Sequence, residues 1–246
     1  MRRYFNTEGL CKPNIHYMVN LDNRLDKIKR LYIDRGKYFI INRGRQYGKT
    51  TTLRALAEYL KNDYRVISLD FQGISTEEFK NEFTFTKAFM RLFEETFRRG
   101  EYDQNEADTV ANCLDESSPY TMGVMFQALS RICNAASKPI VMMIDEVDNA
   151  SNNQVFIDFL SQLRMYYLDR DNRPIFYSVV LAGVYDIKNL KLKIRHDDEH
   201  QYNSPWNIAA KFSMDMSFSA RQITAMLQEF ENDNHTGMDT DTVAHS

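Results

Sequence analysis

The sequence predicts an α/β fold, a three-layer α/β/α sandwich in which a mostly parallel central sheet lies between helices. Short apolar runs alternate with segments of helical periodicity along most of the 246 residues. The run PIVMMI at residues 139–144 is continuously apolar, which is typical of a strand covered on both faces. We expect one domain over residues 1–218 and the start of a short C-terminal helical lid or tail over residues 219–246.

The first part of the chain alternates helix and strand twice. Residues 21–35 carry apolar side chains at helical spacing, and Gly36 ends that helix. KYFIIN, at residues 37–42, predicts a short buried strand. Residues 51–61 return to helical periodicity, and the β-rich run YRVISLDF predicts a second strand at residues 64–71.

The rest of the chain continues the alternation. An acidic, polar segment at residues 100–120 predicts a loop with a short helix. Ser75 and Glu78 have the spacing of a capping box, which predicts that a helix begins there. The further predicted helices are 75–99, 122–136, 154–168 and 219–231, and the further predicted strands are 139–144, 175–182 and 212–218.

Aromatic residues at helical spacing are expected in the core, because such stripes usually pack against a sheet. The stripe here is Phe79, Phe83, Phe89, Phe93 and Phe97. Trp206, the single tryptophan, is expected to pack at a hinge, with stacking on a nucleotide base as the alternative. His196 and His200 flank three acidic residues in a polar stretch, where a solvated loop is a better interpretation than a metal site.

Composition excludes several classes of protein. The net charge of -3 gives no overall basic field for non-specific nucleic-acid binding. Three widely spaced cysteines without a CxxC pair indicate reduced thiols and a cytoplasmic location. The N-terminus MRRYFNTEGL lacks the apolar run of a secretory signal. No apolar run approaches the ~18 residues that a membrane span needs.

The stretch INRGRQYGKTTTL, at residues 41–53, has the features of a phosphate-binding loop. A predicted buried strand leads into it and a helix leads out, so backbone N–H groups and the helix dipole can face an anion. Gly48 permits close approach of the backbone, Lys49 supplies a cation for the β/γ oxygens, and the Thr50 hydroxyl can join a Mg²⁺ shell. We expect nucleotide contacts from Arg43, Gly44, Arg45, Gln46, Tyr47, Gly48, Lys49, Thr50 and Thr51.

The loop departs from the usual GxxxxGK[ST] pattern at its first position. Arg43 stands where that pattern has glycine, and Gly44 is placed to supply the permissive turn one residue later. The alternative is an ordinary strand–turn–helix in which Gly-Lys-Thr occurs by chance.

Two acidic residues follow the apolar run of the third predicted strand. Asp145 ends the run and Glu146 comes next. Ionised acids at the end of a core strand need a cation or a donor. We expect this strand beside the strand at 37–42, with Asp145 holding Mg²⁺ through a water and Glu146 activating the attacking water. Solvated loop acids after an edge strand are the alternative.

With these two motifs the sequence resembles the P-loop ATPases of the AAA and STAND-related classes, over about residues 15–231. The nearest resemblance is to bacterial AAA-ATPase-like proteins in which a loop such as NRGRQYGKT replaces the glycine-rich one. NSPWNIA at 203–209 and FSMDMSFS at 212–219 also resemble that group. The resemblance implies that Arg43 is a family variant, that ATP is the nucleotide, and that the chain is a truncated member.

Enzymes of this class usually read the γ-phosphate with a polar residue at the end of the strand after the acidic one. Here that position is Gly183, with Tyr185 and Asp186 as weaker candidates. Arg164 and Arg221 are candidates for arginines that reach phosphate, with solvated helix charges as the better interpretation.

The predicted function is Mg²⁺-dependent ATP binding and hydrolysis that drives conformational change on an unknown partner, with Glu146 and Lys49 as the catalytic residues. The alternative is a nucleotide-dependent switch or scaffold that hydrolyses little, which the missing side chain at Gly183 favours. A small-molecule kinase has less support, because no acceptor-binding motif is visible. A homo-oligomer is compatible with the sequence, whereas a DNA or protein partner has no support in it and a membrane is excluded.

Overall fold

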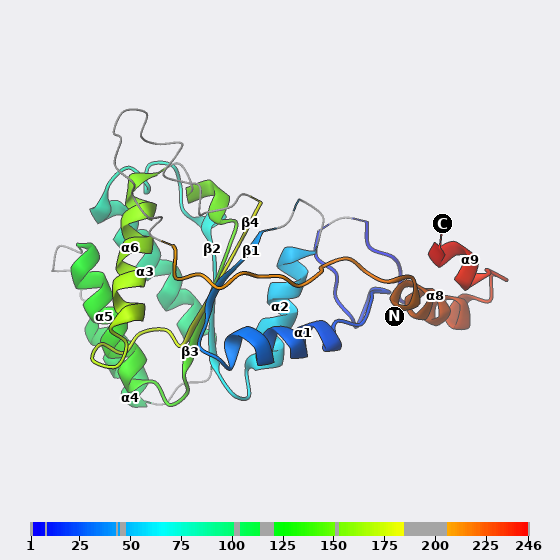
Figure 1. The fold of residues 1–246 in the computed structure, drawn as a ribbon, viewed down its shortest axis with the longest axis horizontal. Helices are drawn as coiled ribbons and strands as arrows, with labels where there is room; N and C mark the ends of the chain where they lie inside the picture. Colours follow the sequence, from blue (N-terminus) through cyan, green and yellow to red (C-terminus); the bar gives the residue numbers. More distant parts are fainter. Residues whose placement is uncertain are drawn as a thin grey trace.

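A single parallel sheet forms the centre of the protein in the computed structural model (Figure 1). Its strands are β1 (Tyr38–Asn42), β2 (Arg65–Asp70), β3 (Ile140–Asp145) and β4 (Ser178–Gly183), in the spatial order β1-β4-β3-β2. Every neighbouring pair is parallel. The α/β prediction with a parallel sheet is therefore confirmed. The structure describes residues 2–7, 9–42, 44, 48–100, 104–113, 121–150, 153–184 and 206–245.

The strand order corrects one expectation. The acidic strand β3 does not neighbour β1, because β4 lies between them and pairs with both. The predicted strand at residues 212–218 is also wrong, since no strand forms there. Instead the backbone N–H of Ala210 donates to the carbonyl of Tyr38 at 2.8 Å, which makes one isolated parallel bridge on the outer side of β1. Such a bridge needs no alternating apolar pattern, so the sequence gives no signal of it.

Helices cover both faces of the sheet (Figure 1). One layer holds α1 (Asp22–Ile28), which continues into a π-helical turn η1 (Lys29–Ile33), and α2 (Lys49–Leu60). The opposite layer holds α3 (Glu82–Arg98), α4 (Gln104–Cys113), α5 (Met122–Ala135) and α6 (Gln154–Leu168). Short 3₁₀ turns, η2 (Phe71–Gly73) and η3 (Val147–Ala150), follow β2 and β3.

Alternation along the strands divides the core between these two layers. Tyr38 and Ile40 of β1 pack with the α3–α6 layer, whereas Phe39 and Ile41 pack with α1 and α2. Successive side chains of a strand point to opposite faces, so a strand that is buried on both faces contributes side chains to the core on each side of the sheet. This double burial explains why the strands read as continuous apolar runs in the sequence.

The aromatic stripe lies in the core with one exception. Phe79, Phe89, Phe93 and Phe97 are at most 3% exposed, but Phe83 is 51% exposed, so that part of the prediction is wrong. The reason is that Phe85, rather than Phe83, begins the buried face of α3, which continues at four-residue spacing through Phe89, Phe93 and Phe97. Asn81 is its N-cap and accepts from the N–H of Thr84 at 3.0 Å. The predicted capping pair Ser75 and Glu78 does exchange hydrogen bonds, within a turn that precedes the helix.

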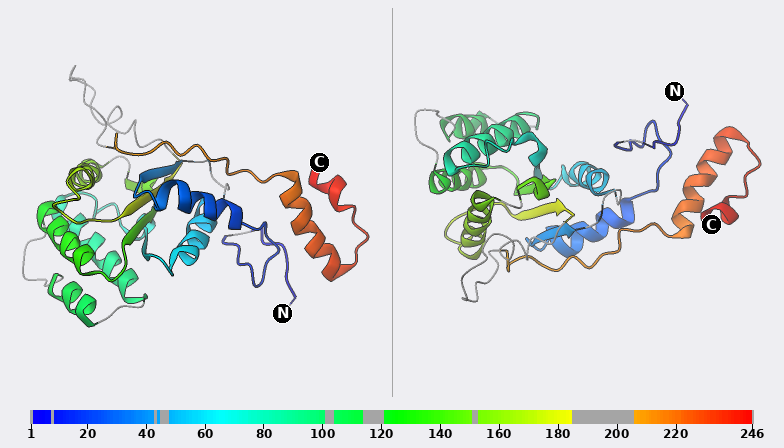
Figure 2. Two further views of the ribbon diagram at one scale, coloured as in Figure 1. Left: turned by 60° about the horizontal axis from the view of Figure 1, so that its bottom comes forward. Right: turned by 90° about the horizontal axis from the view of Figure 1, so that it is seen from above.

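The C-terminal helices lie apart from the sheet in both figures. α8 (Ala220–Asn234) begins at a capping box formed by Ser219 and Gln222, and α9 (Thr240–His245) packs on it (Figures 1 and 2). The N-terminal segment holds α8 through Arg3, whose guanidinium contacts Glu229 at 2.6 Å and Asp233 at 3.0 Å. Tyr17 donates to Asp233 at 2.8 Å. Both ends of the chain therefore meet in one small unit beside the sheet.

Trp206 is fully buried and its ring lies 6.0 Å from that of Tyr38. It is part of the core on the α3–α6 side, so it does not stack on a nucleotide base. None of the helices in the described part of the chain combines the length and the apolar character that a bilayer crossing requires.

Candidate functional site

A cavity of about 640 Å³ opens where β1 passes into α2. Its walls come from four distant parts of the sequence, which are the N-terminal segment, the start of α2, the turn after β2 and the residue after β3. The lining residues are Gly9, Leu10, Gly48, Lys49, Thr50, Thr51, Arg54, Gln72 and Glu146. The two motifs identified in the sequence therefore meet at one cavity.

Gly48 makes the turn from the loop into α2. It has a φ of 66°, in the left-handed region, and is the N-cap of the helix. A β-carbon added there would meet no atom within 4 Å, so backbone conformation rather than space favours glycine. The N-terminal N–H groups of α2 consequently open towards the cavity, where they can bind an anion. Arg43, Arg45, Gln46 and Tyr47 lie outside the described residues, and Gly44 is exposed.

Lys49 is buried although it is cationic. It is 8% exposed, and its Nζ donates to the carbonyl oxygen of Gly44 at 3.0 Å. A buried ammonium group needs anionic or dipolar partners, and a carbonyl of the loop supplies one of them. The cation is thus held at the mouth of α2, where a phosphate would lie.

Thr50 and Asp145 join the two halves of the site. The Thr50 hydroxyl donates to Oδ2 of Asp145 at 2.6 Å. A hydroxyl that donates its proton keeps two lone pairs, so Thr50 can still offer oxygen to a cation. Within the described residues no group of three or more His, Cys, Asp or Glu side chains is placed to hold a metal. Magnesium suits such a site, because it binds proteins through one or two oxygen ligands and takes the others from phosphate and water.

Glu146 has an unusual backbone. Its φ is 54°, one of two positive values among the described non-glycine residues, and its N–H donates to Oδ1 of Asp145 at 3.0 Å. Left-handed conformations cost L-residues about 1–2 kcal/mol and recur at functional sites. Burial raises the pKa of the Glu146 carboxyl, and the neighbouring charge of Asp145 raises it further, while Lys49 lowers it. A carboxylate with a raised pKa is a stronger proton acceptor.

Asp148 is a residue that the sequence reasoning did not single out. Its Oδ2 accepts from the backbone N–H of Val184 at 2.5 Å, just beyond the tip of β4. A β-carbon on Gly183 would lie 3.0 Å from both carboxylate oxygens of Asp148 and 2.9 Å from Cγ2 of Val147. The absence of a side chain at Gly183 is therefore explained by packing, since the Asp148 carboxylate from η3 occupies that space.

Four further lining residues were not predicted. Arg54 follows Thr50 by one helical turn, so helical spacing could have placed it at the site. Gln72 follows β2. Gly9 and Leu10 reach the cavity through tertiary packing, which no local sequence pattern predicts.

The weaker candidates lie elsewhere. The Nε of Arg164 donates to Asn207 at 2.8 Å, and Arg221 on α8 is not part of the cavity lining. Tyr185 and Asp186 fall outside the described residues, as do the histidines of HDDEH.

Comparison with known proteins agrees with this fold. Three archaeal structures share the fold, and this chain spans about half the length of each. Cdc6p from Pyrobaculum aerophilum has 17% identity and a TM-score of 0.52, with 85% of this chain and 48% of that chain covered. ORC2 of Aeropyrum pernix, in ADPNP–ADP complexes, has 11% identity and a TM-score of 0.53 over 86% and 51% of the two chains. ORC1 of Aeropyrum pernix, in complex with DNA, has 11% identity and a TM-score of 0.50 over 88% and 50%.

The curated proteins contain no match to the sequence. The AAA-like domain family matches residues 11–243, which is nearly the whole chain. This chain is therefore a member of the AAA-like domain family.

Proposed function

We propose that the protein binds ATP with Mg²⁺ and hydrolyses it, and that the cycle drives a conformational change on a protein partner. The observation that carries the proposal is the 2.6 Å contact between Thr50 and Asp145. It joins the phosphate-loop helix to the acidic strand at one cavity. Two motifs that occurred independently by chance would not be expected to meet in this way.

Each residue has a role that follows from its position. The N–H groups at the start of α2 and the Lys49 cation hold the phosphates. The Thr50 hydroxyl would ligate Mg²⁺, and Asp145 would hold the ion through a water. A bound ion would supply positive charge that offsets the negative charge of the phosphates during transfer. Glu146 accepts a proton from the water that attacks the γ-phosphorus, while the bond from that phosphorus to the bridging oxygen breaks and ADP leaves.

The test combines binding and turnover in two variants. Lys49→Ala should abolish binding of a fluorescent ATP analogue, because it removes the only loop cation that the roles require. Glu146→Gln should bind the analogue as the wild type does and release no phosphate. Lys61→Ala, at the far end of α2, is the control and should change neither property. Equal loss of binding in both site variants would contradict the assigned roles.

The second candidate is a nucleotide-dependent switch that hydrolyses little. The packing around Gly183 favours it, because the Asp148 carboxylate occupies the space at the tip of β4 and Gly183 has no side chain to face a γ-phosphate. Phosphate release by the purified wild type separates the candidates. A switch would bind nucleotide tightly and release phosphate at a rate close to that of Glu146→Gln.

ATP is proposed over GTP on family membership and on the absence of an NKxD guanine-reading motif after the acidic strand. The ORC1 structure of Aeropyrum pernix contains DNA, but we do not extend that ligand to this chain, whose net charge is -3. Self-association is compatible with the proposal and is not required by it.

A further inference from the structure

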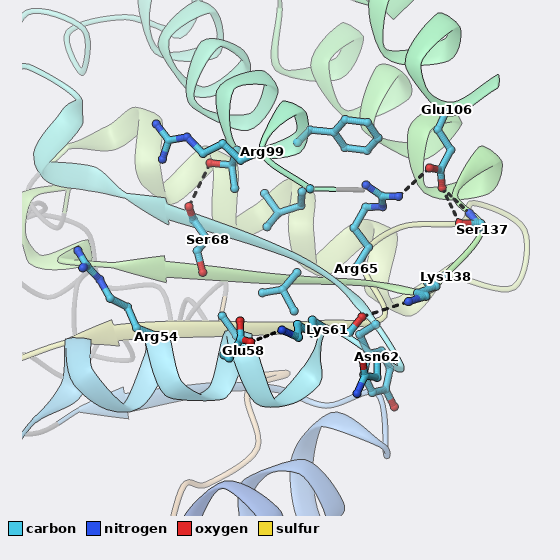
Figure 3. A pocket seen from close by; sticks show the side chains of 17 residues that line it. Arg54, Glu58, Lys61, Asn62, Arg65, Ser68, Arg99, Glu106, Ser137 and Lys138 are labelled. Atoms are coloured by element: carbon cyan, nitrogen blue, oxygen red, sulfur yellow. Dashed lines mark hydrogen bonds and ion pairs between the residues drawn. The ribbon is translucent and has the colours of Figure 1, made fainter. Parts of the chain in front are cut away.

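A second cavity, of about 850 Å³, lies along the outer edge of the sheet, away from the phosphate loop (Figure 3). It follows β2 and is bounded by α2 on one side and by the end of α3 on the other. We call it the β2-edge groove. Its lining includes Arg54, Ala57, Glu58, Lys61, Asn62, Tyr64, Arg65, Val66, Ile67 and Ser68, together with Thr96, Phe97, Arg99, Gly100, Glu106, Ser137 and Lys138.

The groove exposes one edge of a strand. β2 is the last strand of the order and pairs only with β3 in the described part of the protein. The N–H of Arg65 donates to Pro139 at 3.0 Å, on the β3 side. Successive residues of a parallel strand alternate their backbone groups between the two edges, so those of Val66 and Ser68 face the groove. Thr96 confirms this direction, because its hydroxyl donates to the carbonyl of Ser68 at 3.2 Å.

The middle of this edge is only partly protected. Terminal strands are usually shortened, bulged, charged, covered or interrupted by proline, because their free N–H and C=O groups attract other chains. β2 is six residues long, reads RVISLD without proline, and places the neutral residues Val66 and Ser68 at the groove, with Arg65 as the one charged residue of the strand in the lining. The Thr96 hydroxyl bonds to the Ser68 carbonyl, but within the described residues no backbone group accepts from the N–H of Val66 or Ser68. A partly free edge beside a cavity is the arrangement that strand addition uses.

The charges around the edge are predominantly positive. Arg65 is paired with Glu106 at 2.7 Å, and Lys61 is paired with Glu58. The guanidinium groups of Arg54 and Arg99 have no partner among the described residues, although both line the groove. They lie on opposite sides of the edge, Arg54 on α2 and Arg99 after α3 (Figure 3). Acidic side chains on either face of an added strand would therefore meet a cation.

We propose that the β2-edge groove binds an extended acidic segment of a partner protein, which adds to β2 as an outer strand. Its main chain would bond to Val66 and Ser68, and its acidic side chains would face Arg54 and Arg99. A second copy of this chain is disfavoured as the occupant, because β2 pairing with its own copy would bring like cations together. Single-stranded nucleic acid is disfavoured because the aromatic rings of the lining, Tyr64 and Phe97, are 9% and 1% exposed and offer no stacking platform.

The probe is a fluorescein-labelled peptide of about eight residues that repeats Glu-Glu-Val-Val, which places glutamates on both faces of an added strand and is long enough for an ordinary strand. Anisotropy is measured against the wild type with and without added salt. We expect saturable binding that weakens with salt. The same peptide, N-methylated at alternate residues to remove the backbone donors that would face β2, should not bind. Its lysine–valine counterpart should not bind either.

Two pairs of variants locate the binding. Ser68→Pro removes the N–H that faces the groove but none of the bonds to β3, so it should weaken peptide binding by about tenfold or more, whereas Ser68→Thr should not. Arg99→Glu should weaken binding by about tenfold, whereas Arg98→Glu should not, because Arg98 is outside the lining and pairs with Glu94. Arg54 also lines the nucleotide cavity, so it is not varied here.

Circular dichroism and thermal unfolding of each variant show whether it is folded, and ATP-analogue binding by each tests the nucleotide site separately. Absence of acidic-peptide binding to the folded wild type would overturn the proposal. It would also be overturned if the N-methylated peptide bound equally well, since the charges alone would then explain binding. Binding of an oligo-dT of matched charge with the same Arg99 and Ser68 dependence, in preference to the peptide, would assign the groove to nucleic acid instead.

Discussion

The hydroxyl of Thr50 and the carboxylate of Asp145 form a 2.6 Å hydrogen bond, although 95 positions separate them in the chain. Asp145 ends β3, whereas Thr50 is in α2, which follows β1, and β4 lies between these two strands. The contact forms because Thr50 is in the first turn of α2, a helix that packs against β2, β3 and β4. Polar groups that follow β1 and end β3 can thus meet even though these two strands do not pair.

The Thr50 contact predicts a specific loss of magnesium dependence. Thr50→Val keeps the side-chain shape but removes the oxygen ligand, so Mg²⁺ should no longer strengthen ATP-analogue binding. Loss of one ligand or its supporting partner typically weakens metal affinity by about 10–100-fold. The affinity in EDTA should match that of the wild type. Thr50→Ser restores the hydroxyl and should restore the Mg²⁺ effect. An unchanged Mg²⁺ effect in Thr50→Val would remove Thr50 from the metal site.

The raised pKa of Glu146 predicts how hydrolysis depends on pH. Only the ionised carboxylate can accept the proton of water, so the rate should fall as pH falls through the pKa of Glu146, which burial raises from the ordinary value of a glutamate carboxyl. Glu146→Gln should lower the rate by about 10²–10⁴-fold, and its remaining rate should no longer fall at low pH. If the rate of Glu146→Gln still fell with pH as the wild-type rate does, the titrating group would be a residue other than Glu146. The measurement is phosphate release from pH 4.5 upward at saturating ATP.

The same pKa shift predicts a pH-dependent stability difference. A carboxyl whose pKa is raised on folding favours the folded state when protonated, and that contribution is lost as pH rises through the folded-state pKa. Glu146→Gln stays neutral, so it should unfold at higher urea concentration than the wild type at pH 7–8. The difference should shrink as pH falls towards the unfolded-state pKa of about 4.3. A constant difference at every pH would assign the effect to something other than the charge.

The left-handed backbone at Glu146 should also cost stability. Glu146→Gly should be more stable than Glu146→Gln by about 1 kcal/mol, because glycine adopts this conformation without strain. His235, the C-cap of α8 with a φ of 50°, is the matched control. His235→Gly should stabilise by a similar amount and leave ATP hydrolysis unchanged, whereas Glu146→Gly should abolish it. Urea denaturation and phosphate release measure the two effects.

Gly183 should tolerate no side chain while Asp148 is in place. Gly183→Ala would bring its β-carbon within 3.0 Å of the Asp148 carboxylate, and such overpacking costs about 1–3 kcal/mol. Asp148→Ala removes the obstructing oxygens, although Val147 still limits the space. The double variant should therefore lose less stability than the sum of the single variants. Additive losses in a double-mutant cycle would show that the two residues are not coupled.

The buried pair of Arg65 and Glu106 should be important for stability. Their side chains are 8% and 1% exposed, and Glu106 also accepts from the N–H of Ser137 at 2.6 Å and its hydroxyl at 2.9 Å. Removing one partner leaves a buried charge, so Glu106→Ala should lose about 3–5 kcal/mol in urea denaturation. Arg65→Met combined with Glu106→Leu should recover most of that loss. A loss in Glu106→Ala below about 1 kcal/mol would mean that the pair is hydrated.

The sheet and its helices were predictable because burial on two faces leaves continuous apolar runs. PIVMMI and KYFIIN identify β3 and β1 in this way, within one or two residues of their observed bounds. The strand that was wrongly predicted at 212–218 contains polar residues between apolar ones, and the same alternation suits an extended segment that lies along the protein without pairing. Phe83 was misplaced because the buried face of α3 runs through Phe85 at four-residue spacing, and Phe83 lies on another side of the helix.

The candidate site was predictable only where its residues are close in sequence. Gly48, Lys49 and Thr50 form a local pattern whose chemistry requires these residue types in this order, and Asp145 with Glu146 forms a second one. The walls made by Gly9, Leu10 and Gln72 depend on packing, and so does the place of Asp148 over Gly183.

The sequence by itself determined an alternation of buried strands and amphipathic helices, because these patterns record which faces are buried. It also determined the two polar motifs, since each is contiguous. The tertiary structure decided that β4 separates β1 from β3, that Thr50 nevertheless reaches Asp145, and that no strand of the described residues pairs with the outer edge of β2. Those outcomes depend on strand order and on contacts between distant segments, and periodicity along the chain carries no information about which strands become neighbours.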